Sequence, residues 1–266
     1  MPDRGAAARV DGAGGFPELV EIIAVLRAPD GCPWDREQTH MSLRRNLIEE
    51  AYETVAAIET GADAELADEL GDLLLQVVLH AQIASEQGRF DIEDVSRAIV
   101  TKLVRRHPHI FADAEADTPA EVMTRWDAIK RTEKPGHGLL DGIAHTLPAL
   151  SYAEKISRRA ASAGFEWETV DDVWEKVVEE TDELKATAAG SPEAEDELGD
   201  LLFTLVNVGR KMGVDPEQAL RGTCAKFIRR YSGMERAAAS DGQELTAMGI
   251  EEMEALWRRA KEAERA

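Results

Sequence analysis

The chain of 266 residues has few of the features that usually mark a disulfide-bonded, β-rich or membrane protein. Its two cysteines, Cys32 and Cys224, are far apart, which excludes a disulfide framework and a zinc-ligand spacing. Aromatic residues make up 5%, and no segment alternates β-branched and polar residues as a strand does. No apolar run reaches the roughly 18 residues that span a membrane. Residues 1–15 lack the apolar segment of a signal peptide. We therefore expect a reduced, cytoplasmic, helical protein.

Positive charge is also scarce, since 31 Lys and Arg stand against 52 Asp and Glu, for a net charge of -21. A chain without an overall basic field cannot replace the counterions of a nucleic-acid duplex, so we expect no such partner. Local groups of Lys and Arg could still bind a small phosphorylated ligand.

Apolar residues recur at helical spacing through most of the chain, which predicts an all-α fold. Residues 73–83 are apolar almost all round and are expected at the centre of a helical bundle. A helix is expected over residues 216–231. Side chains suited to cap helix N-termini precede or open the helical segments: Ser42, Asp63, Asp91, Thr118, Asp215, and either Thr169 or Asp171.

Four sequence elements occur twice in the same order, which indicates a duplicated helical module. Two of the elements are acidic and two combine Lys, Arg and Trp. The first set is Glu49-Glu50-Ala-Tyr-Glu53, Glu69-Leu-Gly-Asp72, Lys102 with Arg106, and Trp126 with Lys130; the second is Glu179-Glu180-Thr-Asp-Glu183, Glu197-Leu-Gly-Asp200, Lys226 with Arg230, and Trp257 with Lys261. We expect a disordered tail over 1–15, a first module over 16–133, a linker over 134–147 and a second module over 148–266.

Carboxylates three or four residues apart lie on one face of a helix, so each half should gather four or five of them. Most acidic runs are solvated surfaces, but here the motif is doubled in each half and leads into an apolar helix. Like charges at that density require a cation, and oxygen ligands favour Mg²⁺ or Mn²⁺. A di-iron site needs Glu-x-x-His on two helices, and only Glu37 with His40 has that form; His80 is expected to be a packed core histidine.

The repeated basic and indole positions add a second chemistry. Taken one at a time, each of these basic residues would be an ordinary Lys or Arg on a solvated helix face. As a set they can neutralise a polyphosphate, and an indole can stack on a base. No glycine-rich phosphate loop is present, so nucleotide binding would not be of the P-loop kind.

At these residues the chain resembles the MazG nucleotide pyrophosphohydrolases, all-α enzymes in which an EExxE motif is followed by ExxD. Cys32-Pro-Trp-Asp-Arg-Glu-Gln-Thr39 and Gly164-Phe-Glu-Trp167 also look like the tandem-domain bacterial members. The resemblance implies hydrolysis of nucleoside triphosphates, ribo- or deoxyribo- and of any base, to the monophosphate and pyrophosphate. It implies Mg²⁺ bound by Glu180, Glu183, Glu197 and Asp200, and by Glu50, Glu53, Glu69 and Asp72 in the first half.

The resemblance further implies that Glu179 and Glu180 serve in catalysis, with Glu179 a candidate base. It implies substrate contacts from Lys176, Lys226, Arg230, Trp257 and Lys261, and from Lys102, Arg106, Trp126 and Lys130 in the first half. Asn46 stands where the second half has Lys176, so we expect catalysis in the second half. Small modules of this kind usually self-associate, and a homodimer is expected. The alternative is a nucleotide-binding scaffold without turnover.

Overall fold

The structure is a computed structural model that describes residues 14–112, 116, 118–133, 136 and 138–264. The side chains of residues 120, 123, 124, 127 and 130–132 lie outside this description. Most of the predicted tail and part of the predicted linker fall on residues that are likewise outside it.

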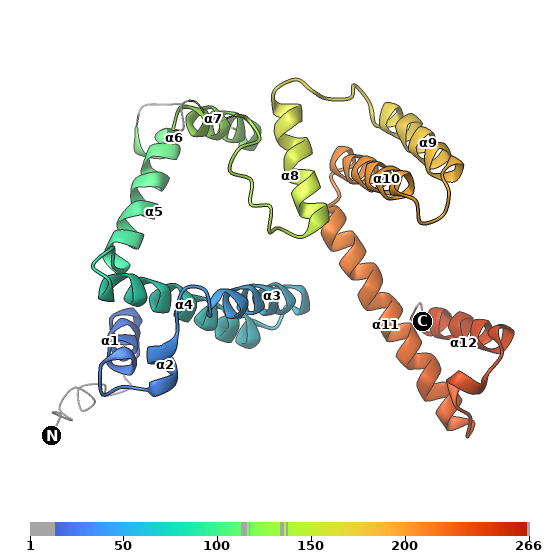
Figure 1. Ribbon diagram of the computed structural model, residues 1–266, viewed down its shortest axis with the longest axis horizontal. Helices are drawn as coiled ribbons and strands as arrows, with labels where there is room; N and C mark the ends of the chain where they lie inside the picture. Colours follow the sequence, from blue (N-terminus) through green and yellow to red (C-terminus); the bar gives the residue numbers. More distant parts are fainter. Residues whose placement is uncertain (1–13, 113–115, 117, 134–135, 137, 265–266) are drawn as a thin grey trace. The chain divides into compact units, whose positions relative to one another are not determined.

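The chain divides into two compact units, residues 1–133 and 134–266, and the described residues of both are helical without a strand (Figure 1). The expected all-α fold is therefore confirmed. Unit 1 contains α1 (Phe16–Arg27), α2 (Pro33–Glu37), α3 (Arg44–Thr60), α4 (Asp63–Glu86), α5 (Ile92–Arg106), α6 (Pro108–Phe111) and α7 (Pro119–Thr132). Unit 2 contains α8 (Ala149–Ser162), α9 (Val170–Ala186), α10 (Pro192–Lys211), α11 (Pro216–Ser240), η2 (Leu245–Ala247) and α12 (Ile250–Ala263). By length and hydropathy, none of these described helices could cross a bilayer.

Local capping sets several helix starts where the sequence predicts them. Asp91, Thr118 and Thr169 each accept a bond from the backbone amide three residues on, and the residue there bonds back. Ser42 is not a cap, because its hydroxyl bonds to Gln38 and to a backbone carbonyl, and α3 begins only at Arg44. Asp63, expected as a cap, is instead the first residue of α4.

Each unit is built on a helical hairpin. In unit 1, α3 packs against α4, and in unit 2, α9 packs against α10. Helix α1 packs against α4, and the main core of unit 1 lies there, formed by Ile23, Leu43, Val78, Leu79 and Ile83. Helix α8 packs against α10, where the buried Ser157 hydroxyl donates to Asn207. These contacts fix the two hairpins that carry the acidic motifs.

Residues 73–83 lie on α4, which packs against α1, α3 and α5 as expected of a central helix, but they are not buried all round. One face of α4 is buried, but Leu74 is 39% exposed and Val77 is 37% exposed. On α10, Leu202 and Leu205 are exposed in the same way. The apolar pattern covers more of each helix than a single chain buries.

Helix α11 does not end at Tyr231 as expected, but continues to Ser240. Its last turns are rich in alanine, which favours a helix, and Met234 and Ala238 are buried against Leu245 and Leu256. This extension provides the surface on which α12 packs.

Candidate active site

The acidic motifs of unit 2 meet across the α9–α10 hairpin. Glu180 on α9 and Glu197 and Asp200 on α10 each present a carboxylate oxygen within 4.8 Å of the others. Glu180 is 3% exposed, whereas Asp200 is exposed to solvent. Burial, followed by the nearby charges of Glu183 and Glu180, raises the pKa of the Glu197 carboxyl above its usual value. The cluster thus combines a buried carboxylate, Glu180, with one that solvent reaches, Asp200.

Unit 1 forms the same cluster from Glu50 on α3 and Glu69 and Asp72 on α4, again within 4.8 Å. Burial raises the pKa of Glu50, with Asp72 as the next cause, and burial also raises the pKa of Glu69. The hydroxyl of Thr54 donates to the backbone carbonyls of Glu50, at 2.8 Å, and Glu69, at 3.4 Å. It therefore links α3 to α4 through the backbone of two of the clustered residues.

The Glu69 carboxylate provides a test of whether a cation fits. Its Oε2 atom is buried and has no hydrogen-bond partner among the described residues. A buried, unpartnered carboxylate oxygen costs free energy unless a cation or a proton meets it. The donor set is all oxygen, which suits a hard cation such as Mg²⁺. The residues present therefore fit a divalent metal.

The structure brings together three of the four expected ligands in each unit. Glu53 and Glu183 are outside the tight groups, but each raises the pKa of a grouped carboxyl, Glu69 and Glu197 respectively. They lie one helical turn beyond Glu50 and Glu180. They are close enough to act electrostatically on the cluster.

Lys176 distinguishes the two clusters. Its Nζ lies 2.6 Å from Oε1 of Glu180 and 2.8 Å from Oε1 of Glu179. Hydrogen bonds to Glu179 and Glu180 raise the pKa of Lys176. Unit 1 has Asn46 at this position and therefore no such cation. The protein thus partly neutralises the cluster of unit 2, whereas no ion pair is recorded at the cluster of unit 1 among its described residues.

The basic and indole residues of unit 2 gather on α11 and α12. The Nε of Arg230 donates to Oε2 of Glu264 at 2.7 Å, and its guanidinium lies 5.6 Å from the centre of the Trp257 ring. Lys226 is half-buried on α11, and Lys261 is exposed on α12.

Unit 1 repeats this arrangement. Arg106 donates from Nε to Oε1 of Glu133 at 3.0 Å, and its guanidinium lies 5.3 Å from the Trp126 ring. Lys102 is exposed on α5, and the side chain of Lys130 lies outside the described residues. Sequence reasoning missed Glu133 and Glu264, although each stands seven residues after its tryptophan and could have been found from the repeat.

The acidic and basic parts of unit 2 are not joined by any ion pair or hydrogen bond that the structure records between described residues, apart from Lys176. Helix α12 packs on α11 and not on the α9–α10 hairpin. The described residues of unit 2 therefore form an acidic part on α9 and α10 and a basic part on α11 and α12, and α11 also packs against α8 and α10.

His40 and His80 stack with ring centres 5.0 Å apart, and their Nδ1 atoms are 2.7 Å apart. Arg89 contacts Nε2 of His40. Neither histidine joins one of the two carboxylate groups in the described part of the chain.

The model of the MazG nucleotide pyrophosphohydrolase domain matches the chain twice, over residues 38–111 and 168–234. These segments contain both acidic clusters. The chain belongs to the MazG family. It is 46% identical over 248 residues to the nucleoside triphosphate pyrophosphohydrolase/pyrophosphatase MazG of Thermotoga maritima, covering 92% of this chain and 95% of that protein.

Two further relatives agree with this assignment. The chain is 44% identical over 254 residues to the nucleoside triphosphate pyrophosphohydrolase of Escherichia coli K12, covering 92% of this chain and 97% of that protein. It is 33% identical over 224 residues to the protein of that name in Mycobacterium tuberculosis, covering 83% of this chain and 59% of that protein. The MazG match ends at residue 234, so the last turns of α11 and all of α12 lie beyond it.

Proposed function

We propose that this chain hydrolyses nucleoside triphosphates to the monophosphate and pyrophosphate, with Mg²⁺ as cofactor and with ribo- and deoxyribonucleotides of any base as substrates. The observation that carries the proposal is the pair of three-carboxylate clusters, one in each MazG-family match. A cytoplasmic role in removing unwanted triphosphates or in nucleotide control under stress would suit such breadth.

In unit 2 the metal would be held by Glu180, Glu183, Glu197 and Asp200, and Mn²⁺ could replace Mg²⁺. Glu50, Glu53, Glu69 and Asp72 would hold it in unit 1. Once bound, Mg²⁺ polarises phosphate oxygens and lowers the pKa of water. The chain itself must bind the phosphates, orient the nucleotide and accept a proton from the attacking water.

Glu179 is our candidate for the proton acceptor. Its side chain is 56% exposed, and its Oε1 is the atom bonded to Lys176, which leaves Oε2 for the water. Lys176 could turn from the two glutamates towards a phosphate without leaving the site, because its side chain is 36% exposed. Unit 1 has no lysine there, and we therefore propose that unit 2 carries the turnover.

Lys226, Arg230 and Lys261 are suited to bind the phosphate chain, and Trp257 is suited to stack on the base. Since the structure records no ion pair or hydrogen bond between these described side chains and the clustered carboxylates of their own chain, we propose that a second copy completes the site. Apolar side chains on α9 to α11 would pack at that interface: Val178 (62% exposed), Leu198 (47%), Phe227 (55%) and Ile228 (63%). The protein would then be a homodimer.

The test of the activity is to incubate the full chain with a nucleoside triphosphate and Mg²⁺ and to separate the products by ion exchange. Monophosphate and pyrophosphate are expected, and a panel of ribo- and deoxyribonucleotides measures base tolerance. Diphosphate with orthophosphate would overturn the proposal. Nucleotide that stays bound and intact would instead support a non-catalytic scaffold.

The dimer has its own test. Light scattering after gel filtration should give twice the chain mass, and a monomer would reject the interface. Glu180→Gln and Arg230→Ala should each be inactive alone. If two copies share a site, mixing the two variants should restore part of the activity, because some dimers then contain one intact site. No recovery would place both residues in one chain's site.

A further inference from the structure

A groove lies between α11 and α12. The MazG match ends at residue 234, so the lining residues Arg236 and Ala237 and all those on α12 lie beyond it, whereas Arg229, Arg230 and Gly233 lie within it. The groove has a volume of about 500 Å³. Its floor is made of small side chains, with Gly233 and Ala237 on α11 and Ala260 and Ala263 on α12. A volume of this size falls within the roughly 300 to 1,000 Å³ of ordinary small-molecule sites.

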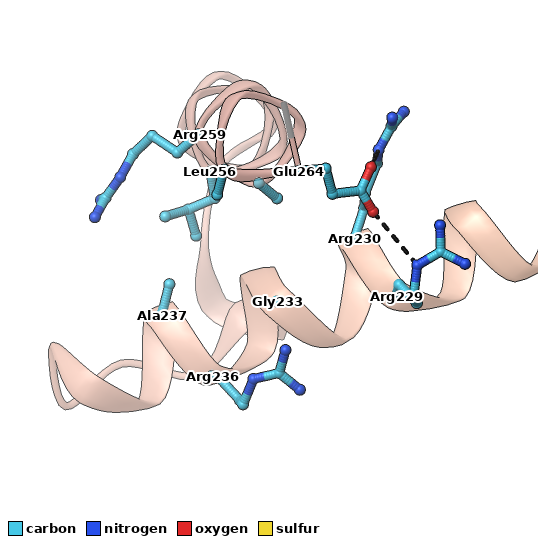
Figure 2. Close-up of a pocket in the computed structure, with 10 residues that line it drawn as sticks. Arg229, Arg230, Gly233, Arg236, Ala237, Leu256, Arg259 and Glu264 are labelled. Atoms are coloured by element: carbon cyan, nitrogen blue, oxygen red, sulfur yellow. Dashed lines mark hydrogen bonds and ion pairs between the residues drawn. The ribbon is translucent and has the colours of Figure 1, made fainter. Parts of the chain in front are cut away.

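The polar lining of the groove is almost entirely basic. Arg229, Arg230 and Arg236 come from α11, and Arg259 comes from α12 (Figure 2). Glu264 is the single carboxylate in the lining. Four guanidinium groups and one carboxylate leave an excess of positive charge, in a chain whose net charge is -21.

Glu264 pairs with only two of the four arginines, Arg229 and Arg230. Its carboxylate bonds to Arg230 at 2.7 Å and lies 3.6 Å from Nε of Arg229. In Figure 2 it stands between these two arginines, while Arg236 and Arg259 lie away from it. The structure records no carboxylate partner for Arg236 or Arg259 among residues 138–264. Two guanidinium groups therefore remain available at the groove.

Unit 1 lacks these two arginines although it repeats the rest. It has the Arg105 and Arg106 pair on Glu133, which matches Arg229 and Arg230 on Glu264. Helix α5 ends at Arg106, so it offers no surface like that of residues 233–240. Ala128 stands on α7 where α12 has Arg259. The extra basic groups are thus a property of unit 2 and do not follow from the duplicated plan.

We propose that this groove is a second anion site, which binds a small ligand carrying two or more linked phosphate groups. Guanidinium groups bind phosphate oxygens through paired, charge-assisted hydrogen bonds, and linked phosphates can reach arginines on both helices at once. The ligand is either an inorganic polyphosphate or the phosphate chain of a nucleotide. The site does not use the acidic clusters or their metal. It shares Arg230 with the substrate contacts of the proposed function, whereas Arg236 and Arg259 belong to the groove alone.

Calorimetric titration of the full chain with inorganic triphosphate, at low salt and with a chelator present, tests the site. Without metal the acidic clusters repel the probe, so binding reports on basic groups alone. The double variant Arg236→Ala with Arg259→Ala should bind at least roughly tenfold more weakly, since it removes two charge-assisted contacts. Both side chains are exposed, and circular dichroism should show an unchanged helix content.

The matched control is Arg158→Ala with Arg258→Ala. It removes the same charge from α8 and α12, at residues that do not line the groove, and it should bind as the unmodified chain does. The proposal would be overturned if both double variants lost affinity equally, if the groove variant bound as tightly as the unmodified chain, or if the unmodified chain did not bind triphosphate.

A parallel titration with a nucleoside triphosphate separates the two possible sources of the ligand. Tighter binding than inorganic triphosphate supports a nucleotide, and equal binding supports the phosphate chain alone.

Discussion

Glu180→Gln is the sharpest test of the site, because it removes one charge and keeps the shape of a side chain that is 3% exposed. The carboxylate belongs to the group with Glu197 and Asp200. It is also one of the two partners of Lys176, whose Nζ lies 2.6 Å away. The substitution therefore affects both the proposed metal ligation and an ion pair, and the two effects differ in size.

The effect on stability should be small. Lys176 keeps its bond to Glu179 at 2.8 Å, and its side chain is 36% exposed, so the lost ion pair is worth about 1 kcal/mol or less. Removing one of three like charges offsets part of that loss. A change of about 1 kcal/mol moves the unfolding midpoint of a chain of this size by roughly 2 to 4 °C.

The effect on turnover should be large. A metal contributes several kcal/mol to the stabilisation of a transition state at phosphorus, and each 1.36 kcal/mol is about tenfold in rate. Loss of a buried ligand should therefore lower kcat by roughly 10²- to 10³-fold. Pyrophosphate release from a nucleoside triphosphate with saturating Mg²⁺ measures it, next to a thermal unfolding curve of the same sample.

Glu50→Gln is the matched control, since it makes the same change in the cluster of unit 1. We expect it to leave most of the activity intact, because we assign turnover to unit 2. Activity of Glu180→Gln near that of the unmodified chain would refute the ligand assignment. A midpoint that falls by much more than a few degrees would refute the stability argument, and the loss of activity would then have no mechanistic meaning.

Three further outcomes are expected. Burial, then the proximity of His40, lowers the pKa of His80, so the stability of unit 1 should fall as pH drops below about 6.5, where the unfolded chain takes up a proton; His80→Leu should remove this part of the dependence in urea unfolding. The pKa of Glu133 is held at about 2, chiefly by the Arg106 hydrogen bond. Glu133→Gln should therefore destabilise the chain at pH 7, by a difference that shrinks as pH falls below about 4.5 and that equal loss at all pH values would contradict. Mg²⁺ should raise the melting temperature after chelator treatment, and by less in Glu69→Gln, whereas no shift in either protein would argue against the metal sites.

Much of this protein can be read from its sequence because the relevant interactions are local. Asp91, Thr118 and Thr169 cap their helices through bonds that reach only three residues. Glu197 and Asp200 share a helix face because of the helix period alone. The duplication then places an equivalent cluster in each unit, since equal motifs fold into equal hairpins.

Other features depend on contacts between distant residues, and only the tertiary structure decides them. Arg230 donates a hydrogen bond to Glu264, which stands 34 residues further along the chain. Helix α11 extends to Ser240 because η2 and α12 cover its last turns. How two helices meet across a hairpin decides which three carboxylates come together in each cluster. The sequence by itself thus determined the helices, their duplication and the acidic chemistry, through the period and capping of single helices. Packing between helices decided which groups meet, because those distances do not follow from any one segment.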